Sequence, residues 1–532
     1  MIKTIKSILN KILCFFRPEK EKNEMNFIIT KPTTQLLNDP TTPALKIVKK
    51  IVPVKFLNFS VLGFNKTGNA LLSEGWQKEN VYANINSTLG FFKKYFPANV
   101  KKWAATNNLV VNTRAGNDAN AYYDRRGLKF FYFNANKKII YTCDSADVVT
   151  HELGHAILDS IRPDFWNIAA FEIGAFHESF GDMIALLTIL NYDVCLNQLL
   201  QNTNNDLEKS NFASQLAEQF GVSLKIGNCL RNALNNYNYV EPETLPYDGN
   251  GLIQEIHSFS QVWTGTFYEI LVEFFNLFGK NYNALVQARD LSAEFLFNAA
   301  ANTPANNKFF MALANNYIAY DLSKYSSQYT SILTKVFLKR NLISASLAES
   351  LTNKKFNILS DNNNVLVKEE KFTSLSCSEF NLNGNEFNVQ IAADSYKPAN
   401  GVFNALSVVE NYDDSLNAAK SFVKYLKSKD NIGEKPNQSW EIDKKSNNLV
   451  RKFSCCSDLG FINNCTIEGQ PEYGKCWKPD NNSGCCPYGC PKTPEPIVPL
   501  KQECSISYNS CNSNSYNNCN GTIYSVCNCR KR

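Results

Sequence analysis

The stretch "DVVTHELGHAILD", residues 147–159, holds two of the four histidines in a chain of 532 residues. Its apolar residues recur at helical spacing, which predicts an amphipathic helix. Residues four apart on a helix lie on the same face, so His151 and His155 can ligate one metal ion. Glu152, next to the first histidine, can reach a water on that ion without ligating it. The spacing predicts a metal site with a general base, and the scarcity of histidine argues against a chance pair on a surface helix.

A third ligand is expected, because a catalytic zinc ion usually takes three protein ligands and keeps one position open. The stretch "EIGAFHESFGD", residues 172–182, also has helical spacing and carries Glu178 and Asp182 one turn apart. We predict Glu178 as the third ligand and Asp182 as the acceptor for the outer N–H of a ligand histidine. His177 competes for the ligand role, but it points about 100° away from Glu178 around the helix. We therefore expect His177 to pack beside the site or to support it.

The fourth histidine, His257, stands just before the strongly helical stretch "SFSQVWTGTFYEIL". A lone histidine in this position is more often structural. Beside a zinc site, however, an imidazole can stabilise the negative charge that develops on a carbonyl oxygen during acyl transfer. We predict this catalytic role for His257.

The composition predicts a folded globular chain of two to four domains, since 44% of the residues are hydrophobic and 20% are charged. No apolar run approaches 18 residues, so we expect no transmembrane helix. The net charge of +6 is mild and the basic residues are scattered, so no nucleic-acid partner is expected. Strand-like stretches flank a helical one early in the chain, helical patterning dominates the middle, and a mixed stretch follows. The fold class is therefore α+β, with five predicted parts: a leader and linker (1–45), a β-rich N-terminal lobe (46–148), a helical zinc-binding lobe (149–346), an accessory mixed α/β region (347–450) and a Cys-rich module (451–532).

Cysteine is concentrated at the C-terminal end, where twelve of the 17 cysteines lie between Cys455 and Cys529. This tail contains no C-x2-C pair, the usual signature of a zinc module. An even number of cysteines in a short polar stretch predicts a disulfide framework, and so an oxidising, extracellular compartment. The basic N-terminus conflicts with this, because Asn10 and Lys11 interrupt its apolar run and it lacks a clean signal peptide. The compartment stays open.

Five motifs, in the right order, resemble those of the thermolysin-like gluzincin metallopeptidases. The two stretches above resemble that family's two zinc helices, and "NAYYD" (residues 120–124) resembles its N-A-[FY]-W edge strand. "CLRNALN" (229–235) resembles its L-R-S-M element, and "IHSFSQVWTGTFYEIL" (256–271) resembles the helix that carries its transition-state histidine. The resemblance covers about residues 50–345. It implies a two-lobed fold with a β-rich N-terminal lobe and a mainly helical C-terminal lobe.

The resemblance also implies a role for each matching residue. One zinc ion per chain is implied, together with a peptide or protein as substrate. Asn120 and Ala121 would hold an extended substrate, and Arg231 would bind a substrate carbonyl. The implied zinc ligands are His151, His155 and Glu178, with Glu152 as base, Asp182 as hydrogen-bonding partner and His257 as transition-state donor.

Three departures from the family pattern are visible. The loop between the zinc helices, residues 161–171, has no Tyr, although the family often uses one for the oxyanion. Leu252 replaces an Asp that the family places five residues before its catalytic histidine, and Glu255 is the available substitute. Asp147 matches a calcium-binding position, but the acidic cluster expected after the second zinc helix is missing. Calcium is therefore possible but not supported by the sequence.

Two functions are compatible with these features. The first is a zinc endopeptidase that hydrolyses peptide bonds with a metal-activated water and Glu152 as general base. The alternative is a catalytically weak scaffold that acts as a binding or adhesive protein, with the Cys-rich tail contacting a surface or partner. Glu152 favours the peptidase, since zinc binding alone does not need it.

Overall fold

The computed structural model describes residues 31–64, 68–352, 365–367, 370–393, 395–397 and 412–455. All of them belong to one compact unit, which ends at Thr466. The predicted disulfide framework lies outside the described residues, as do residues 1–30 of the predicted leader. Four cysteines with described side chains, Cys143, Cys195, Cys229 and Cys377, are free thiols.

Residues of the predicted leader and linker form a strand that packs on the N-terminal lobe. Strand β1 (Thr33–Leu36) pairs antiparallel with β2 (Lys46–Lys49). The amide of Leu36 donates to Asn80 Oδ1 at 2.9 Å, on helix α2 (Glu74–Phe92). The helix starts where the Ser73 hydroxyl accepts from the amide of Trp76, and an N-cap of this kind satisfies a donor that a helix start leaves open. The four-residue sequences of β1 and β2 show no clear alternation of polar and apolar residues, so the sequence does not predict their pairing.

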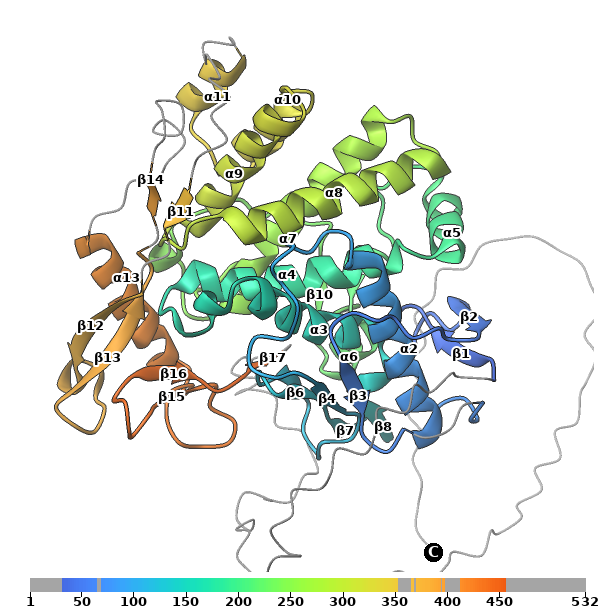
Figure 1. The fold of residues 1–532 in the computed structure, drawn as a ribbon, viewed down its shortest axis with the longest axis horizontal. Coiled ribbons are helices and arrows are strands. Elements are labelled where there is room, and N and C mark those ends of the chain that lie inside the picture. The colour runs from blue at the N-terminus through green and yellow to red at the C-terminus, as the bar shows by residue number, and fades with distance from the viewer. Residues whose placement is uncertain are drawn as a thin grey trace, which may run out of the picture. The chain divides into compact units, whose positions relative to one another are not determined.

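A mixed five-stranded sheet forms the N-terminal lobe, in the order β17-β5-β6-β4-β3 (Figure 1). Strands β3, β4 and β6 run parallel, whereas β5 is antiparallel to β6. Gly127 opens β6, and a side chain there would clash with the Val110 carbonyl on β4. The strands span Phe59–Val61 (β3), Leu109–Asn112 (β4), Ala121–Tyr123 (β5), Gly127–Phe130 (β6) and Ser454–Cys455 (β17).

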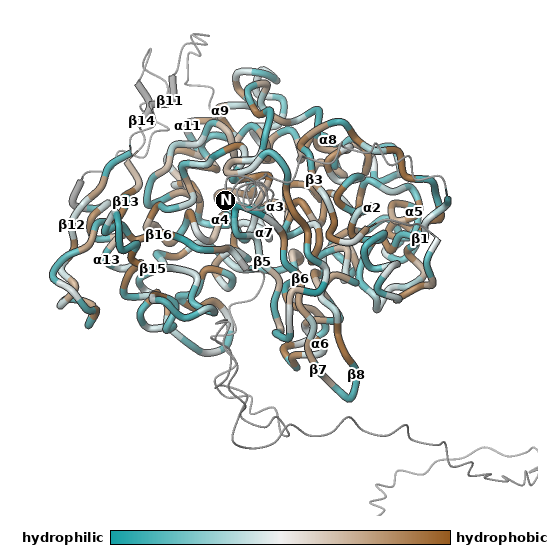
Figure 2. The backbone as a smooth tube through the Cα atoms, turned by 60° about the horizontal axis from the view of Figure 1, so that its bottom comes forward, coloured by the Kyte–Doolittle hydropathy of each residue, from teal (hydrophilic) through white to brown (hydrophobic). Residues whose placement is uncertain are grey.

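A second hairpin, β7 (Tyr132–Ala135) and β8 (Lys138–Tyr141), projects from the body beside helix α6 (Glu218–Ser223) (Figure 2). Phe133 meets Phe220 edge to face there, with ring centroids 5.5 Å apart. The short strands β9 (Gln215–Leu216) and β10 (Arg231–Asn232) pair antiparallel in the same part of the chain. Short 3-10 helices cover Thr142–Asp144, Pro163–Asn167, Pro242–Thr244 and Cys377–Phe380.

The helical lobe is built around α3 (Ala146–Ile161), α4 (Phe171–Ile189) and α7 (Ile256–Leu277), which pack against one another. Nearly all of α4 is buried, with apolar residues on every face, as expected for a helix at the centre of a core. The remaining helices surround these three and span Asp193–Thr203 (α5), Tyr282–Asn302 (α8), Phe309–Lys324 (α9), Thr330–Lys339 (α10) and Ala345–Thr352 (α11).

Among the described residues, no single helix is long and apolar enough to cross a membrane. Helices α4 and α5 reach that length and apolarity only as a pair, and they meet at a bend of 94°.

The accessory region packs directly on α4 and on the segment that precedes it. It contains α13 (Tyr412–Ser428), whose Tyr425 ring meets Phe171 at the start of α4, with centroids 5.3 Å apart. The amide of Ala169, between α3 and α4, donates to the Gln390 carbonyl at 2.8 Å. The strands of this region are β11 (Val365–Val367), β12 (Lys371–Ser376), β13 (Glu386–Ile391), β14 (Ser395–Lys397), β15 (Trp440–Ile442) and β16 (Leu449–Arg451).

Candidate metal centre

Two glycines let the central helices approach closely enough to build a shared site. A Cβ atom on Gly154 of α3 would lie 2.7 Å from the Cα of Gly181 on α4. A Cβ atom on Gly181 would lie 2.6 Å from Nδ1 of His151. Both distances are far inside van der Waals contact, so these positions accept no side chain without movement of the helices or of the imidazole.

The crossing of α3 and α4 brings together the three predicted ligands. One ligand atom each from His151, His155 and Glu178 lies within 4.8 Å of the others, and all three residues are buried. His151 Nε2 is 3.3 Å from Glu178 Oε2, and His155 Nε2 is 3.7 Å from Glu178 Oε1. Two imidazole nitrogens and one carboxylate oxygen are the donor set of catalytic zinc sites, so the residues present fit this metal.

Asp182 fixes the orientation of the first ligand. Its Oδ1 lies 3.0 Å from His151 Nδ1, so the proton on that nitrogen is held away from the site and Nε2 faces Glu178. Arg231 donates to both carboxylate oxygens of Asp182, over 2.7–3.1 Å. Burial alone would raise the pKa of Asp182, but Arg231 and His151 hold it below the usual value. Arg231 therefore holds Asp182 in the position from which it orients His151.

The charges at the site suit a cation. Burial opposes ionisation of Glu178, yet His257, His155 and His151 hold its pKa well below the usual range. Burial lowers the pKa of His155 well below its ordinary value, leaving a neutral imidazole. Burial also lowers the pKa of His151, but the carboxylates of Asp182 and Glu178 outweigh it and raise the pKa to about 9. A metal ion must displace the extra ring proton of His151 before it can bind there, so the affinity for metal rises with pH.

His257 reaches the same carboxylate from the start of α7. Its Nε2 lies 3.3 Å from Glu178 Oε2, and its Nδ1 lies 2.6 Å from Glu255 Oε1. Glu255 also accepts from the amides of His257 and Ser258, which makes it the N-cap of α7. The orienting carboxylate that is missing at Leu252 is therefore supplied by Glu255, the substitute considered from the sequence.

Comparison with known families identifies the core of the chain. Residues 125–345 match the model of the fungalysin metallopeptidase (M36) family. Residues 125–345 thus form a metallopeptidase region of the fungalysin type. The family is a thermolysin-like gluzincin family of metalloendopeptidases, so the resemblance inferred from the sequence is confirmed. No curated protein matches the chain significantly.

His177 does not join the three candidate ligands. Its ring packs between those of His155 and Trp166, with centroid distances of 5.7 and 6.1 Å. Among the residues described, neither ring nitrogen has a hydrogen-bond partner. Burial lowers its pKa well below the usual value, so the ring is neutral. The sequence analysis expected His177 to pack beside the site or to support it.

The remaining predicted residues are Glu152, Asn120 and Ala121. Glu152 is fully buried on α3, next to the ligand His151. Ala121 opens β5, and Asn120 precedes it, with its carbonyl accepting from Thr142 Oγ1 at 3.2 Å. The Asn120 side-chain oxygen is buried, and within the described parts of the chain it has no hydrogen-bond partner.

Two residues that sequence reasoning missed touch the ligands. Ser454 Oγ lies 3.2 Å from Glu178 Oε1 and 3.4 Å from both ring nitrogens of His155. Arg451 Nη2 lies 3.9 Å from Glu178 Oε1. No motif surrounds either residue, and 276 residues separate Ser454 from Glu178, so no signal in the sequence could have found them.

A cluster of three buried carboxylates lies apart from the candidate zinc ligands. Oxygens of Asp39, Asp147 and Glu218 lie within 4.8 Å of one another. Burial, followed by the two neighbouring carboxylates, raises the pKa of Asp147 well above its usual value. Asp147 is the position that the family resemblance links to calcium. Its acidic neighbours here, Asp39 and Glu218, come from other parts of the chain than the stretch after the second zinc helix. Carboxylate oxygens are the donors that calcium prefers.

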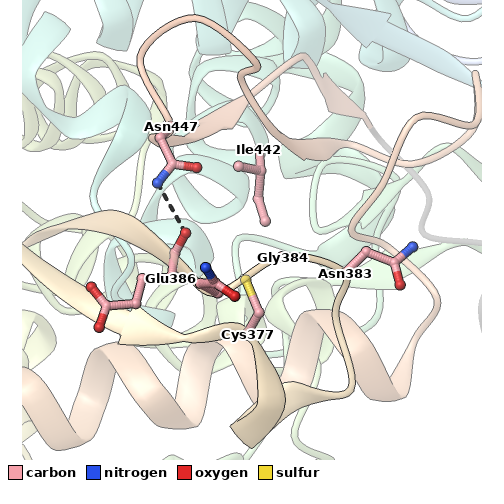
Figure 3. Close-up of a pocket in the computed structure, with 7 residues that line it drawn as sticks. Cys377, Asn383, Gly384, Glu386, Ile442 and Asn447 are labelled. Atoms are coloured by element: carbon pink, nitrogen blue, oxygen red, sulfur yellow. Dashed lines mark hydrogen bonds between the residues drawn. The ribbon is translucent and has the colours of Figure 1, made fainter.

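The hollow in Figure 3 lies in the accessory region, where Asn447 Nδ2 donates to the Glu386 carbonyl at 2.9 Å. It is lined by polar side chains, Cys377 and Ile442, and it contains no residue of the metal centre.

Proposed function

We propose that this protein is a zinc-dependent endopeptidase in which Glu152 is the general base. The observation that carries the proposal is the convergence of His151, His155 and Glu178, with Asp182 bonded to the first of them. A zinc ion held by these three residues supplies Lewis acidity toward water and toward a carbonyl oxygen.

The proton steps are assigned to Glu152. Its carboxylate accepts a proton from the water that attacks the scissile carbonyl carbon. The same carboxyl then delivers that proton to the amide nitrogen as the C–N bond breaks. The products are a carboxylate and a protonated amine, which together hold all the atoms of the amide and the water, so atoms and charge balance without another reactant.

His257 is assigned to the developing oxyanion. The bond between Nδ1 and Glu255 fixes the ring, so that Nε2 points toward Glu178 and the site. A donor that is already oriented costs little reorganisation free energy when negative charge develops on the carbonyl oxygen. Arg231, which donates to Asp182 beside His151, is assigned to a substrate carbonyl, as the family resemblance implies.

The substrate is a protein or peptide, as the family implies. We place its extended backbone along β5, where Ala121 opens the strand and the buried Asn120 side-chain oxygen needs a donor. Backbone hydrogen bonds to a strand edge hold a peptide of almost any sequence.

The test is Glu152→Gln in the full chain, assayed on a peptide library and for bound zinc. The variant keeps the shape of the side chain but cannot accept the proton, so we expect loss of nearly all turnover with zinc retained. A chelator should abolish wild-type cleavage, and added zinc should restore it. Wild-type turnover by the zinc-loaded variant would contradict the role assigned to Glu152, and no cleavage by the zinc-loaded wild type would favour a binding protein.

A further inference from the structure

The last described residues return from the accessory region to the metal centre. After β16 (Leu449–Arg451), the chain forms β17, which pairs antiparallel with β5: Ser454 lies opposite Tyr123 and Cys455 opposite Tyr122. Without β17, β5 would be the edge of its sheet (Figure 1). The edge assigned above to the substrate is therefore occupied by the chain itself.

This segment reaches the zinc ligands as well as the strand. Ser454 is 1% exposed, and its hydroxyl lies 3.2–3.4 Å from Glu178 and His155. A segment that pairs with β5 and turns one side chain toward the ligands sits as an extended substrate would.

Arg451 holds the segment in place through both its backbone and its side chain. Its carbonyl accepts from Trp166 Nε1 at 2.9 Å, and its guanidinium lies 5.1 Å from the centroid of the Trp166 ring system. Its Nη2 donates to Ser454 Oγ at 2.7 Å. Because the guanidinium is nearly buried and 3.9 Å from Glu178, it also offsets the negative charge of that carboxylate.

Phe453 adds an apolar contact on the strand. Its ring stacks on Tyr122, with centroids 4.7 Å apart. By contrast, the neighbouring Lys452 points to the accessory region, where Nζ donates to the carbonyls of Gly433 and Lys435. The contacts to β5 and to the ligands are thus made by three side chains of one short segment.

We propose that residues 451–455 are a cis-acting, substrate-like ligand of the peptide groove, which must leave β5 before a protein substrate can bind. The inference rests on the function proposed above. One strand edge accepts one partner, so the segment and a substrate compete for the same backbone groups. A tethered ligand competes at an effective concentration that reaches millimolar, far above that of most substrates.

Competition of this kind has a kinetic signature. The apparent affinity for substrate falls by the fraction of molecules in which the groove is open. Once a substrate is bound, the segment is displaced and the chemical step proceeds unchanged. Release of the segment should therefore lower KM and leave kcat nearly constant.

The experiment compares three full-length proteins: wild type, Phe453→Ala/Ser454→Pro and Lys452→Ala. The double variant removes the ring stack, the Ser454 hydroxyl and one backbone donor, whereas Lys452→Ala is the matched control because its side chain points away. We measure hydrogen exchange at the amides of β5, bound zinc, and kcat and KM on a peptide. In the double variant we expect faster exchange at Tyr123, which lies opposite Ser454, unchanged zinc and a KM lower by about tenfold or more. The control should match wild type.

Equal exchange and equal KM in the double variant and wild type would overturn the inference. So would a lower kcat/KM with zinc retained, because the segment would then be a structural wall of the site. If the double variant does not fold, Arg451→Ala keeps the backbone pairing and should still lower KM. If the proposed function is wrong, no zinc-loaded form of the protein will cleave the peptide. Hydrogen exchange will still report whether β17 leaves β5, so the two failures are distinguishable.

Discussion

The metal centre and the peptide groove are neighbours, yet they are built in different ways. The metal centre comes from two helices close in sequence, α3 and α4, and each contributes its side chains at one-turn spacing. The groove is bounded by β5 and by a segment from more than 300 residues later in the chain. The contrast shows that the predicted ligand set of the metal centre is encoded locally, whereas access to it depends on long-range packing.

In the metal centre, the largest effect on catalysis is expected at His257, which reaches Glu178 from α7. We expect His257→Ala to lower kcat/KM by about 10²–10³, mostly through kcat, because it removes a donor that matters in the transition state. Zinc content should not change. Steady-state kinetics on a peptide check this, with zinc measured in the same preparation.

Glu255→Gln refines the same test. The amide still fits the cap of α7, but it no longer gives His257 a carboxylate partner, so a loss of about 10–100-fold is expected. Full kcat in folded, zinc-loaded His257→Ala would show that this histidine only packs at the helix start.

A smaller effect is expected where the two zinc helices cross. Gly181→Ala puts a methyl group into the space of the His151 imidazole, so the ring must move. We expect zinc affinity to fall by about 10–100-fold, as when a ligand loses its support. Gly174→Ala on the same helix is the matched control, since its Cβ would meet two side chains outside the ligand set, Ile256 at 3.3 Å and Phe422 at 3.9 Å. Zinc titration with a competing chelator measures both, and equal affinities would remove the steric argument.

The smallest effect concerns the packing that joins α4 to the rest of the helical lobe. Burial raises the pKa of Glu172 to about 8, although the amide of Phe310 and the hydroxyl of Tyr239 donate to its carboxyl group. The folded state thus holds a proton that the unfolded state releases at a lower pH. Stability from this group is complete below the unfolded value of 4.5 and is lost as pH rises to about 8.

Glu172→Gln imitates the protonated form and should flatten that dependence. We expect the melting temperature of wild type to fall more steeply than that of the variant between about pH 5 and 8. Thermal unfolding across this range is the measurement. Parallel curves for the two proteins would show that Glu172 is ionised in the folded state.

The sequence predicted the parts of the site that follow a regular period. Helical spacing identified His151, His155, Glu178 and Asp182, and the angle around the helix separated His177 from them. Short-range spacing also offered Glu255 as the partner of His257.

Contacts between distant segments could not be predicted. Asp39 was assigned to a leader, yet it lies with Asp147 and Glu218 in a buried carboxylate group. Strand β17 is two residues long, too short for any alternation of polar and apolar residues to show. Which strand such a segment joins is decided by the folded surface and not by its own composition.

The central claim is that His151, His155 and Glu178 hold one zinc ion in this chain. Anomalous X-ray scattering at the zinc edge, on crystals of the full-length protein, tests it most directly. The account predicts one peak per chain, bonded to both imidazoles at about 2.0–2.1 Å and to Glu178 at about 2.0–2.2 Å. A zinc-loaded protein with no peak at these three residues, or with the metal held by other side chains, would contradict it.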